Sequence, residues 1–354
     1  MTTNLNVAVF GAYGHTGRFV VAELLDRGYA PVLIGRDPAK LSALAASLSS
    51  SSSAALPGLE SHQASADDPA ALDWALAGAA AVINCAGPFA STTAPVVEAA
   101  LRAGIPYVDV AAEIEANVDT FEHFAERARE AGTVVVPAMA FFGGLGDLLV
   151  TAAAGDWTAA DEVHVAYGLS SWHPTAGTLA AGTVSDGRRG GRGVRFTEGR
   201  LQYHDDARPS LEWPFPEPLG PQQVIGEFTM ADVVTVPSHL AVPEVTTYMT
   251  AVAAADLAAP DAAAPAAVDD RGRSAQTFVV DVVVRSGGAE RRLTASGQDI
   301  YAISAPLAVE AVDRILTGRA RATGVVSAGA AFDAPDFLRA LAPHLTVGQP
   351  LDAA

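Results

Sequence analysis

Three glycines near the start of the chain have a spacing that suits the diphosphate of a dinucleotide. Gly11, Gly14 and Gly17 follow an apolar run at residues 7–10 and open an amphipathic run. A strand, a glycine turn and a helix in this order place the free N–H groups of the helix start against a diphosphate. The alternative is an ordinary strand–turn–helix corner, because glycines at this spacing occur in many folds. The expected cofactor contacts in this turn are Gly11, Tyr13, Gly14, His15, Thr16 and Gly17.

The end of the second apolar run indicates which dinucleotide the turn binds. In NAD sites an acidic side chain at this point bonds the ribose 2′-hydroxyl. Here residues 32–34 are followed by Gly35 and Arg36, and Asp37 comes one residue late. Arg36 and Lys40 offer cations to a 2′-phosphate, so the sequence favours NADP. The alternative is that both cations are solvated charges at a helix start.

Two later apolar runs end in residues that we expect near the nicotinamide. The carboxyl ends of parallel strands are where such sheets bind ligands. Asp109 and Glu113 follow the run that begins at residue 105, and a carboxyl group there is suited to proton transfer. The alternative is that these acids cap and begin the next helix. The run at 79–85 leads into a small-residue turn whose expected cofactor contacts are Ala86, Gly87, Pro88 and Phe89.

A histidine and a cluster of arginines in the second half of the chain are further candidates. His173 precedes an expected helix at 175–184, and an imidazole is suited to proton transfer near neutral pH. The alternative is a surface or capped histidine. The arginines either clamp a carboxylate or a phosphopantetheine-type group, or belong to a solvated loop. They are Arg188, Arg189, Arg192 and Arg195.

The order of the apolar runs predicts the fold that must position these groups. Between residues 4 and 137, strand-like and helix-like runs alternate about six times. This pattern predicts an α/β fold with a doubly wound parallel sheet of Rossmann type. Beyond a glycine-rich crossing at 138–147 the runs are mostly strand-like, which predicts a second α+β domain on a mainly antiparallel sheet. There we expect a strand at 233–236 and a proline-rich loop at 208–221.

Charge and composition exclude several classes of partner and mechanism. The formal net charge of −18 argues against nucleic acid and against an anionic membrane surface. One cysteine, Cys85, and eight histidines without ligand spacing leave no metal site to expect. No apolar run approaches ~20 residues, and the start lacks a basic and apolar leader, so we expect a cytoplasmic chain without a membrane span. Lys40 is the only lysine, which excludes the Tyr-x-x-x-Lys pair of short-chain dehydrogenases.

Five stretches resemble the saccharopine dehydrogenase-like oxidoreductases, a group that includes trans-acting enoyl reductases. The stretch at 82–89 (VINCAGPF) and the Tyr-Val-Asp at 107–109 are the more specific ones, and Tyr13 departs from the usual threonine or serine. The resemblance implies NADP(H), an inserted domain that often forms a homodimer through its sheet, and a C-terminal helix that returns to the first domain. The stretches lie at 11–18, 35–41, 82–89, 103–109 and 297–302.

These observations together predict an NADP(H)-dependent oxidoreductase. It would transfer hydride to or from a C=N or C=C bond of a small organic substrate, because members of the group act on such bonds. The alternative is a non-catalytic NADP-binding sensor or partner-binding module, since no catalytic acid is strongly marked. We divide the chain into an NADP-binding domain at 1–140, a substrate and dimerisation domain at 141–298 and a C-terminal segment at 299–354.

Overall fold

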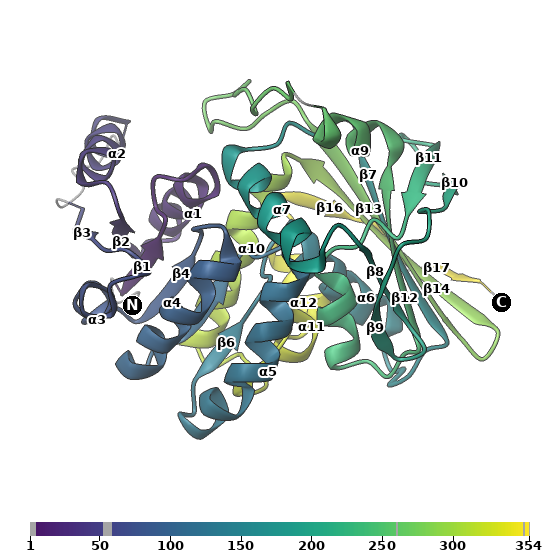
Figure 1. The fold of residues 1–354 in the computed structure, drawn as a ribbon, viewed down its shortest axis with the longest axis horizontal. Coiled ribbons are helices and arrows are strands. Elements are labelled where there is room, and N and C mark those ends of the chain that lie inside the picture. The colour runs from purple at the N-terminus through teal and green to yellow at the C-terminus, as the bar shows by residue number, and fades with distance from the viewer. Residues whose placement is uncertain (1–4, 52–58, 260, 350, 354) are drawn as a thin grey trace.

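The computed structural model describes residues 5–51, 59–259, 261–349 and 351–353, which form two sheets with helices around them (Figure 1). The first sheet is built from β1 (Asn6–Phe10), β2 (Ala30–Gly35), β3 (Ser61–Gln63), β4 (Ala81–Asn84), β5 (Tyr107–Asp109), β6 (Val134–Val136) and β15 (Gly324–Val325). The helices between these strands are α1 (His15–Asp26), α2 (Pro38–Ser51), α3 (Pro69–Leu76), α4 (Phe89–Ala103) and α5 (Ile114–Glu130).

The first sheet confirms the predicted doubly wound α/β fold. Its strands run in the order β15-β6-β5-β4-β1-β2-β3, and every pairing is parallel. Val7 and Val9 of β1 belong to the apolar cluster of α1, whereas Ala8 and Phe10 belong to the cluster of α4. Burial on both faces explains why this strand is a continuous apolar run. The strand order reverses at β1, so a crevice forms beyond the carboxyl ends of β1 and β4.

The second sheet is mixed and mostly antiparallel, as predicted. It contains β7 (Glu162–Leu169), β8 (Gly193–Thr197), β9 (Arg200–His204), β10 (Ser210–Pro214), β11 (Pro221–Gly226), β12 (Glu244–Thr250), β13 (Thr277–Ser286), β14 (Ala289–Gln298), β16 (Leu345–Val347) and β17 (Leu351–Ala353). Its longest path is β10-β11-β12-β7-β13-β14-β16, and within it β12 and β7 are parallel. Associated helices are η1 (Phe141–Leu145), α6 (Gly146–Ala154), α7 (Ala176–Arg189), α8 (Asp232–Thr235), η2 (Val236–Ser238) and α9 (Ala251–Ala258).

Two local expectations in this part of the chain were wrong. The run at 233–236 is helical, with α8 at Asp232–Thr235 followed by η2 at Val236–Ser238. Val233, Thr235 and Val236 are all buried, so burial does not alternate as it does along a half-exposed strand. The proline-rich stretch at 208–221 contains the strand β10. Prolines conceal that strand in the sequence, but the indole of Trp213 donates a hydrogen bond of 2.8 Å to Asp281 of β13.

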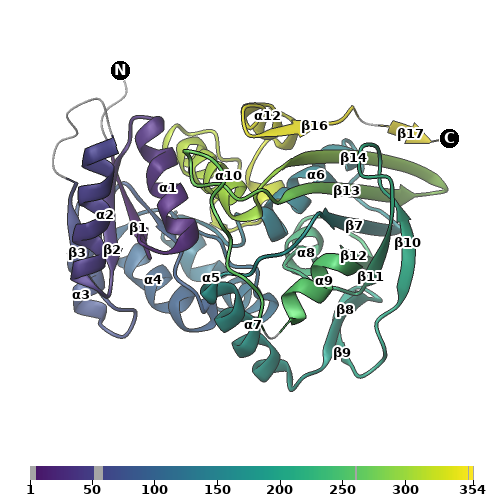
Figure 2. The same ribbon diagram turned by 90° about the horizontal axis from the view of Figure 1, so that it is seen from above.

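The C-terminal segment connects the two sheets. It contains α10 (Ile300–Leu316), α11 (Ala328–Ala331) and α12 (Ala334–Ala340). Figure 2 shows α10 beside α1, where the hydroxyl of Tyr29 donates to Asp313 at 2.6 Å. The strand β15 then joins the first sheet, and β16 and β17 join the second. Within the described part of the chain, no helix is long and apolar enough to span a membrane.

Candidate functional site

A cavity of about 1320 Å³ lies between the two sheets, beyond the carboxyl ends of β1, β2 and β4. It extends from the glycine turn to α7 and to the second sheet. Of the residues predicted to bind cofactor, Gly17 and Lys40 do not line it. The remaining ten do line it: Gly11, Tyr13, Gly14, His15, Thr16, Arg36, Ala86, Gly87, Pro88 and Phe89.

The glycine turn has the close packing that a diphosphate cradle requires. Gly11 has φ +85°, and a Cβ there would lie 2.9 Å from Cβ of Ala86. A Cβ on Gly17 would lie 2.2 Å from the carbonyl oxygen of Gly11, so Gly17 allows α1 to pack on the turn. Gly14 immediately precedes α1. No side chain caps the start of this helix, and the first turn of α1 contains no acidic residue. The N–H groups at this end are therefore free to meet an anion.

We expect the adenosine of NADP at the end of the cavity that adjoins the carboxyl end of β2. One cation lies there, and no acid lies where an NAD site would bond the ribose. Arg36 is exposed and lines the cavity. The Asp37 carboxylate accepts backbone N–H groups of Ala39 and Lys40, so it starts α2 instead of facing a ribose. The Lys40 ammonium lies 3.9 Å from Asp37 and is solvent-exposed. This donor set fits a 2′-phosphate at Arg36.

Tyr13 connects the glycine turn to this end of the cavity. A Cβ on Gly35 would lie 2.4 Å from the Tyr13 ring, so the ring packs on the glycine backbone. The Tyr13 hydroxyl accepts the N–H of Asp37 at 3.3 Å. The tyrosine that departs from the usual threonine or serine therefore braces the loop that carries Arg36.

A buried network of side-chain hydrogen bonds stabilises the turn after β4. The Asn84 side-chain oxygen accepts the N–H of Ala86 at 3.0 Å, and its amide donates to the Tyr107 hydroxyl at 3.1 Å. The Tyr107 hydroxyl donates in turn to Asp109 at 2.8 Å. The Thr92 hydroxyl donates to the carbonyl of Ala86 at 2.5 Å. These bonds hold the turn at the position expected for the nicotinamide.

Asp109 lies within this network and does not reach the cavity. Its side chain is fully buried, and it accepts N–H groups of Ala111 and Ala138 in addition to the Tyr107 hydroxyl. Burial raises the pKa of Asp109 to about 6, although the three donors oppose the shift. Asp109 therefore positions the end of β5, and the geometry gives it no contact with a substrate.

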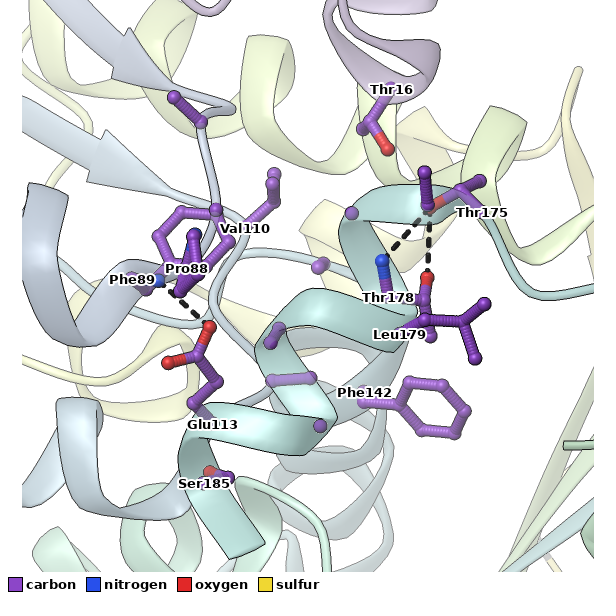
Figure 3. Close-up of a pocket in the computed structure, with 18 of the residues that line it drawn as sticks. Thr16, Pro88, Phe89, Val110, Glu113, Phe142, Thr175, Thr178, Leu179 and Ser185 are labelled. Atoms are coloured by element: carbon purple, nitrogen blue, oxygen red, sulfur yellow. Dashed lines mark hydrogen bonds between the residues drawn. The ribbon is translucent and has the colours of Figure 1, made fainter. Parts of the chain in front are cut away.

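Glu113 does face the cavity. Its carboxylate accepts the N–H of Phe89 at 2.7 Å and the N–H of Ala90 at 3.0 Å, which caps α4 (Figure 3). Glu113 also precedes α5, but it makes no side-chain capping bond there. Burial raises the pKa of Glu113 despite both N–H donors, and the nearby Asp109 adds to the rise.

The helix α7 crosses the cavity opposite Glu113. Figure 3 shows it with Thr178, Leu179 and Ser185 on the cavity side. Of its side chains, Ser185 alone is fully buried, so α7 is held mainly at its two ends. His173 lies in the loop before α7 and is not among the residues that line the cavity, so the structure does not bring it to the expected site.

Tyr301 holds the N-terminal end of α7, a role that the sequence did not reveal. Its hydroxyl accepts the indole N–H of Trp172 at 3.1 Å and the backbone N–H of Thr175 at 3.2 Å. It also shares a hydrogen bond of 2.9 Å with the Thr178 hydroxyl. The Tyr301 ring contacts the His15 ring edge-on, with 5.1 Å between centroids. Tyr301 thus links the glycine turn to α7. It belongs to the stretch at 297–302 that resembles the family, but that stretch does not indicate its contacts with α7.

The basic run does not form an anion clamp. Arg188 pairs with Asp119 at 2.8 Å, and Arg195 with Asp206 at 3.0 Å. Arg192 stacks on the ring of Tyr203. Arg189 lines the cavity but pairs with Glu115 at 3.3 Å, which secures the C-terminal end of α7.

The fold and the glycine turn define an NADP-binding protein of Rossmann type. Residues 7–136 match the family model described as the saccharopine dehydrogenase NADP binding domain. This stretch of the chain is therefore similar to that domain, as the resemblance in the sequence implied, and NADP is its cofactor.

Two relatives extend the comparison. The chain is 30% identical over 149 residues to a probable mitochondrial saccharopine dehydrogenase-like oxidoreductase of Arabidopsis thaliana. That match covers 38% of this chain and 32% of the relative, so it spans about a third of that protein's length. The fold matches apo saccharopine dehydrogenase (L-Glu forming) from Saccharomyces cerevisiae with a TM-score of 0.64, over 99% of this chain and 100% of that one. At 13% identity this likeness shows the fold alone.

Proposed function

We propose that the protein is an NADP(H)-dependent oxidoreductase that transfers hydride to or from a C=N or C=C bond of a small organic substrate. One observation carries the proposal: a single cavity joins Arg36 and the glycine turn to Glu113, and continues to the second sheet. A hydride-transfer site needs a nicotinamide, a space for substrate and a proton donor side by side. The cavity supports all three.

Each part of the chain has a distinct task in this proposal. NADPH supplies the hydride when it is bound. Arg36 binds the 2′-phosphate and the start of α1 binds the diphosphate. The turn at 86–89, held by Asn84, positions the nicotinamide, and Glu113 holds the proton that the substrate receives. Helix α7 excludes water from the same space.

The first test is cofactor binding. Titration of NADPH fluorescence should show binding to the wild-type protein, and Arg36→Ala should weaken NADPH by about tenfold or more, with little change for NADH. Lys40→Ala is the matched control, because its ammonium lies outside the cavity lining. Equal weakening of NADPH and NADH would contradict the role of Arg36, and no binding of either cofactor would overturn the proposal.

A measurement of hydride transfer distinguishes an oxidoreductase from a non-catalytic NADP-binding sensor. Stereospecific loss of deuterium from one face of labelled NADPH would establish catalysis. Binding of NADPH without transfer to any imine or enoyl compound would favour a non-catalytic sensor. The homodimer and the cytoplasmic location remain proposals from the sequence; sedimentation analysis and fractionation of cells would test them.

A further inference from the structure

The half of the cavity that adjoins the second sheet has an apolar wall. Its Trp172 indole N–H is already bonded to Tyr301, so the ring presents no free donor. Trp172 lies 5.3 Å from the Phe142 ring and 6.3 Å from the Phe228 ring, which makes a connected aromatic surface. The wall consists of Phe142, Trp172, Ile225, Phe228, Met230 and Leu257.

A wall of this composition favours a hydrocarbon body over a polar one. Burial of apolar surface against aromatic rings stabilises a ligand by roughly 25 cal/mol for each Å². A polar group placed there would lose its bonds to water without replacement. Leu179 of α7 also lines the cavity, so a further apolar side chain comes from outside this wall (Figure 3).

One arginine stands at the edge of this wall. Arg208 lines the cavity, and its guanidinium carbon lies 5.5 Å from the centroid of the Phe228 ring. The next residue is anchored, because the carbonyl of Pro209 accepts the N–H of Gly226 at 2.7 Å. A Cβ on Gly226 would lie 2.9 Å from the Pro209 ring, so the loop and β11 pack closely. The fold therefore holds the backbone next to Arg208, whose side chain is exposed at the cavity.

Arg208 has no anionic partner within the described residues. Three arginines line the cavity: Arg36, Arg189 and Arg208. The guanidinium of Arg189 is used by Glu115, whereas Arg36 faces the adenosine end. In the described part of the chain, no carboxylate forms an ion pair with Arg208. A chain with a net charge of −18 thus holds an unpaired cation beside an apolar wall.

We propose that Arg208 binds the carboxylate of a substrate whose remaining body is hydrocarbon-rich. The inference rests on the proposed function, because it names the substrate class of the same cavity. A guanidinium offers two parallel N–H donors that match a carboxylate. The apolar wall receives the body of the substrate, and the bond to be reduced lies between that wall and Glu113.

The test uses octanoate and octanamide as matched probes, titrated by calorimetry into the protein saturated with NADP. Octanoate should bind more tightly than octanamide. Arg208→Ala should weaken octanoate by about tenfold and leave octanamide unchanged, and Arg208→Lys should restore part of the difference. Arg192→Ala, which removes an arginine that stacks on Tyr203 outside the cavity lining, should change neither probe.

The outcomes separate this inference from the proposed function. Equal affinity of the wild type for the two probes, or octanoate binding unchanged by Arg208→Ala, would overturn the role of Arg208 while NADPH titration remained normal. Absence of NADPH binding would overturn the proposed function alone. In that case the same octanoate titration on cofactor-free protein still decides the role of Arg208.

Discussion

Single residues in this site owe their chemistry to their surroundings. Asp109 and Glu113 follow the same strand, yet the first is enclosed among N–H and hydroxyl donors and the second faces the cavity. Burial raises the pKa of both groups. Of these two acids, only Glu113 combines a raised pKa with a place on the cavity, which is the combination that a general acid requires.

At this scale the pKa of Glu113 gives a prediction. Because burial favours the neutral acid, the carboxyl should keep its proton to a higher pH than an ordinary glutamate. Infrared titration should show a protonated carboxyl band that is lost in Glu113→Gln. Substrate reduction should decrease by about 100-fold in that variant, and its wild-type decline with rising pH should disappear.

The matched control for Glu113 is Asp186→Asn, which changes an exposed acid on the same cavity. It should keep both the infrared band and the pH profile. A band that disappears in Asp186→Asn, or persists in Glu113→Gln, would contradict the assignment. NADPH affinity should remain close to the wild-type value in both variants, which separates the proton role from a disturbed cofactor turn.

The helix α7 is the element whose placement most affects the site. It is attached at one end through Tyr301 and at the other through Arg188 and Arg189, with few buried side chains between. Elements with so little buried surface open locally at low free-energy cost. We therefore expect α7 to exchange its backbone hydrogens faster than the strands of either sheet.

Tyr301→Phe tests how α7 is held. The change leaves the indole N–H of Trp172 and the backbone N–H of Thr175 without their acceptor, each at a cost of about 1–3 kcal/mol. Hydrogen exchange at the start of α7 should rise by about tenfold or more. The control Tyr29→Phe removes a hydroxyl bond to Asp313 far from α7 and should leave this exchange unchanged. Equal exchange in Tyr301→Phe and wild type would show that other contacts hold the helix.

At the scale of the whole molecule, a buried ion pair connects three segments that are distant in the sequence, around Asp147, His239 and Gly329. Asp147 of α6 is fully buried and lies 2.6 Å from the His239 ring nitrogen. Its other oxygen accepts the N–H of Gly329 in the C-terminal segment at 2.6 Å. A Cβ on Gly329 would lie 2.6 Å from His239, so the glycine is needed for this close approach. Burial lowers the pKa of His239, but Asp147 raises it by more.

Removal of this carboxylate should destabilise the fold. Asp147→Ala should lower the free energy of unfolding by about 3–5 kcal/mol, measured by denaturant titration. The folded pKa of His239 lies above the unfolded value, so the pair stabilises fully below that unfolded value and less as pH rises through the folded one. The loss should therefore be larger at about pH 6 than at about pH 9.

The control for Asp147 is Asp156→Ala, which removes an exposed carboxylate paired with Arg291. A surface pair of this kind contributes about 0–1 kcal/mol. If Asp147→Ala cost no more than this control, the buried pair would not hold the segments together. If its cost grew with rising pH, the sign of the His239 shift would be contradicted.

The sequence by itself determined the fold class, the cofactor and most of the residues that line the cavity around the glycine turn. Alternating apolar runs and the spacing of Gly11, Gly14 and Gly17 are local patterns, and backbone geometry turns them directly into structure. The prediction of a strand at 233–236 was wrong because a run of only four residues, three valines and a threonine, fits either the helical or the strand period. The strand at 210–214 was missed because Pro209, Pro214 and Pro216 are typical of a loop, although β10 pairs with the nearby strand β11.

Only the tertiary structure decided which polar groups reach the cavity. Asp109, Glu113 and His173 are equally strong candidates in the sequence. In the structure Asp109 is buried, His173 lies outside the cavity lining, and Glu113 lines the cavity. The surroundings of Arg208 and Tyr301 are formed by Phe228, Gly226 and Thr175, which lie between 18 and 126 residues away along the chain. A side chain's solvent exposure, partners and pKa depend on such distant neighbours, which no local pattern contains.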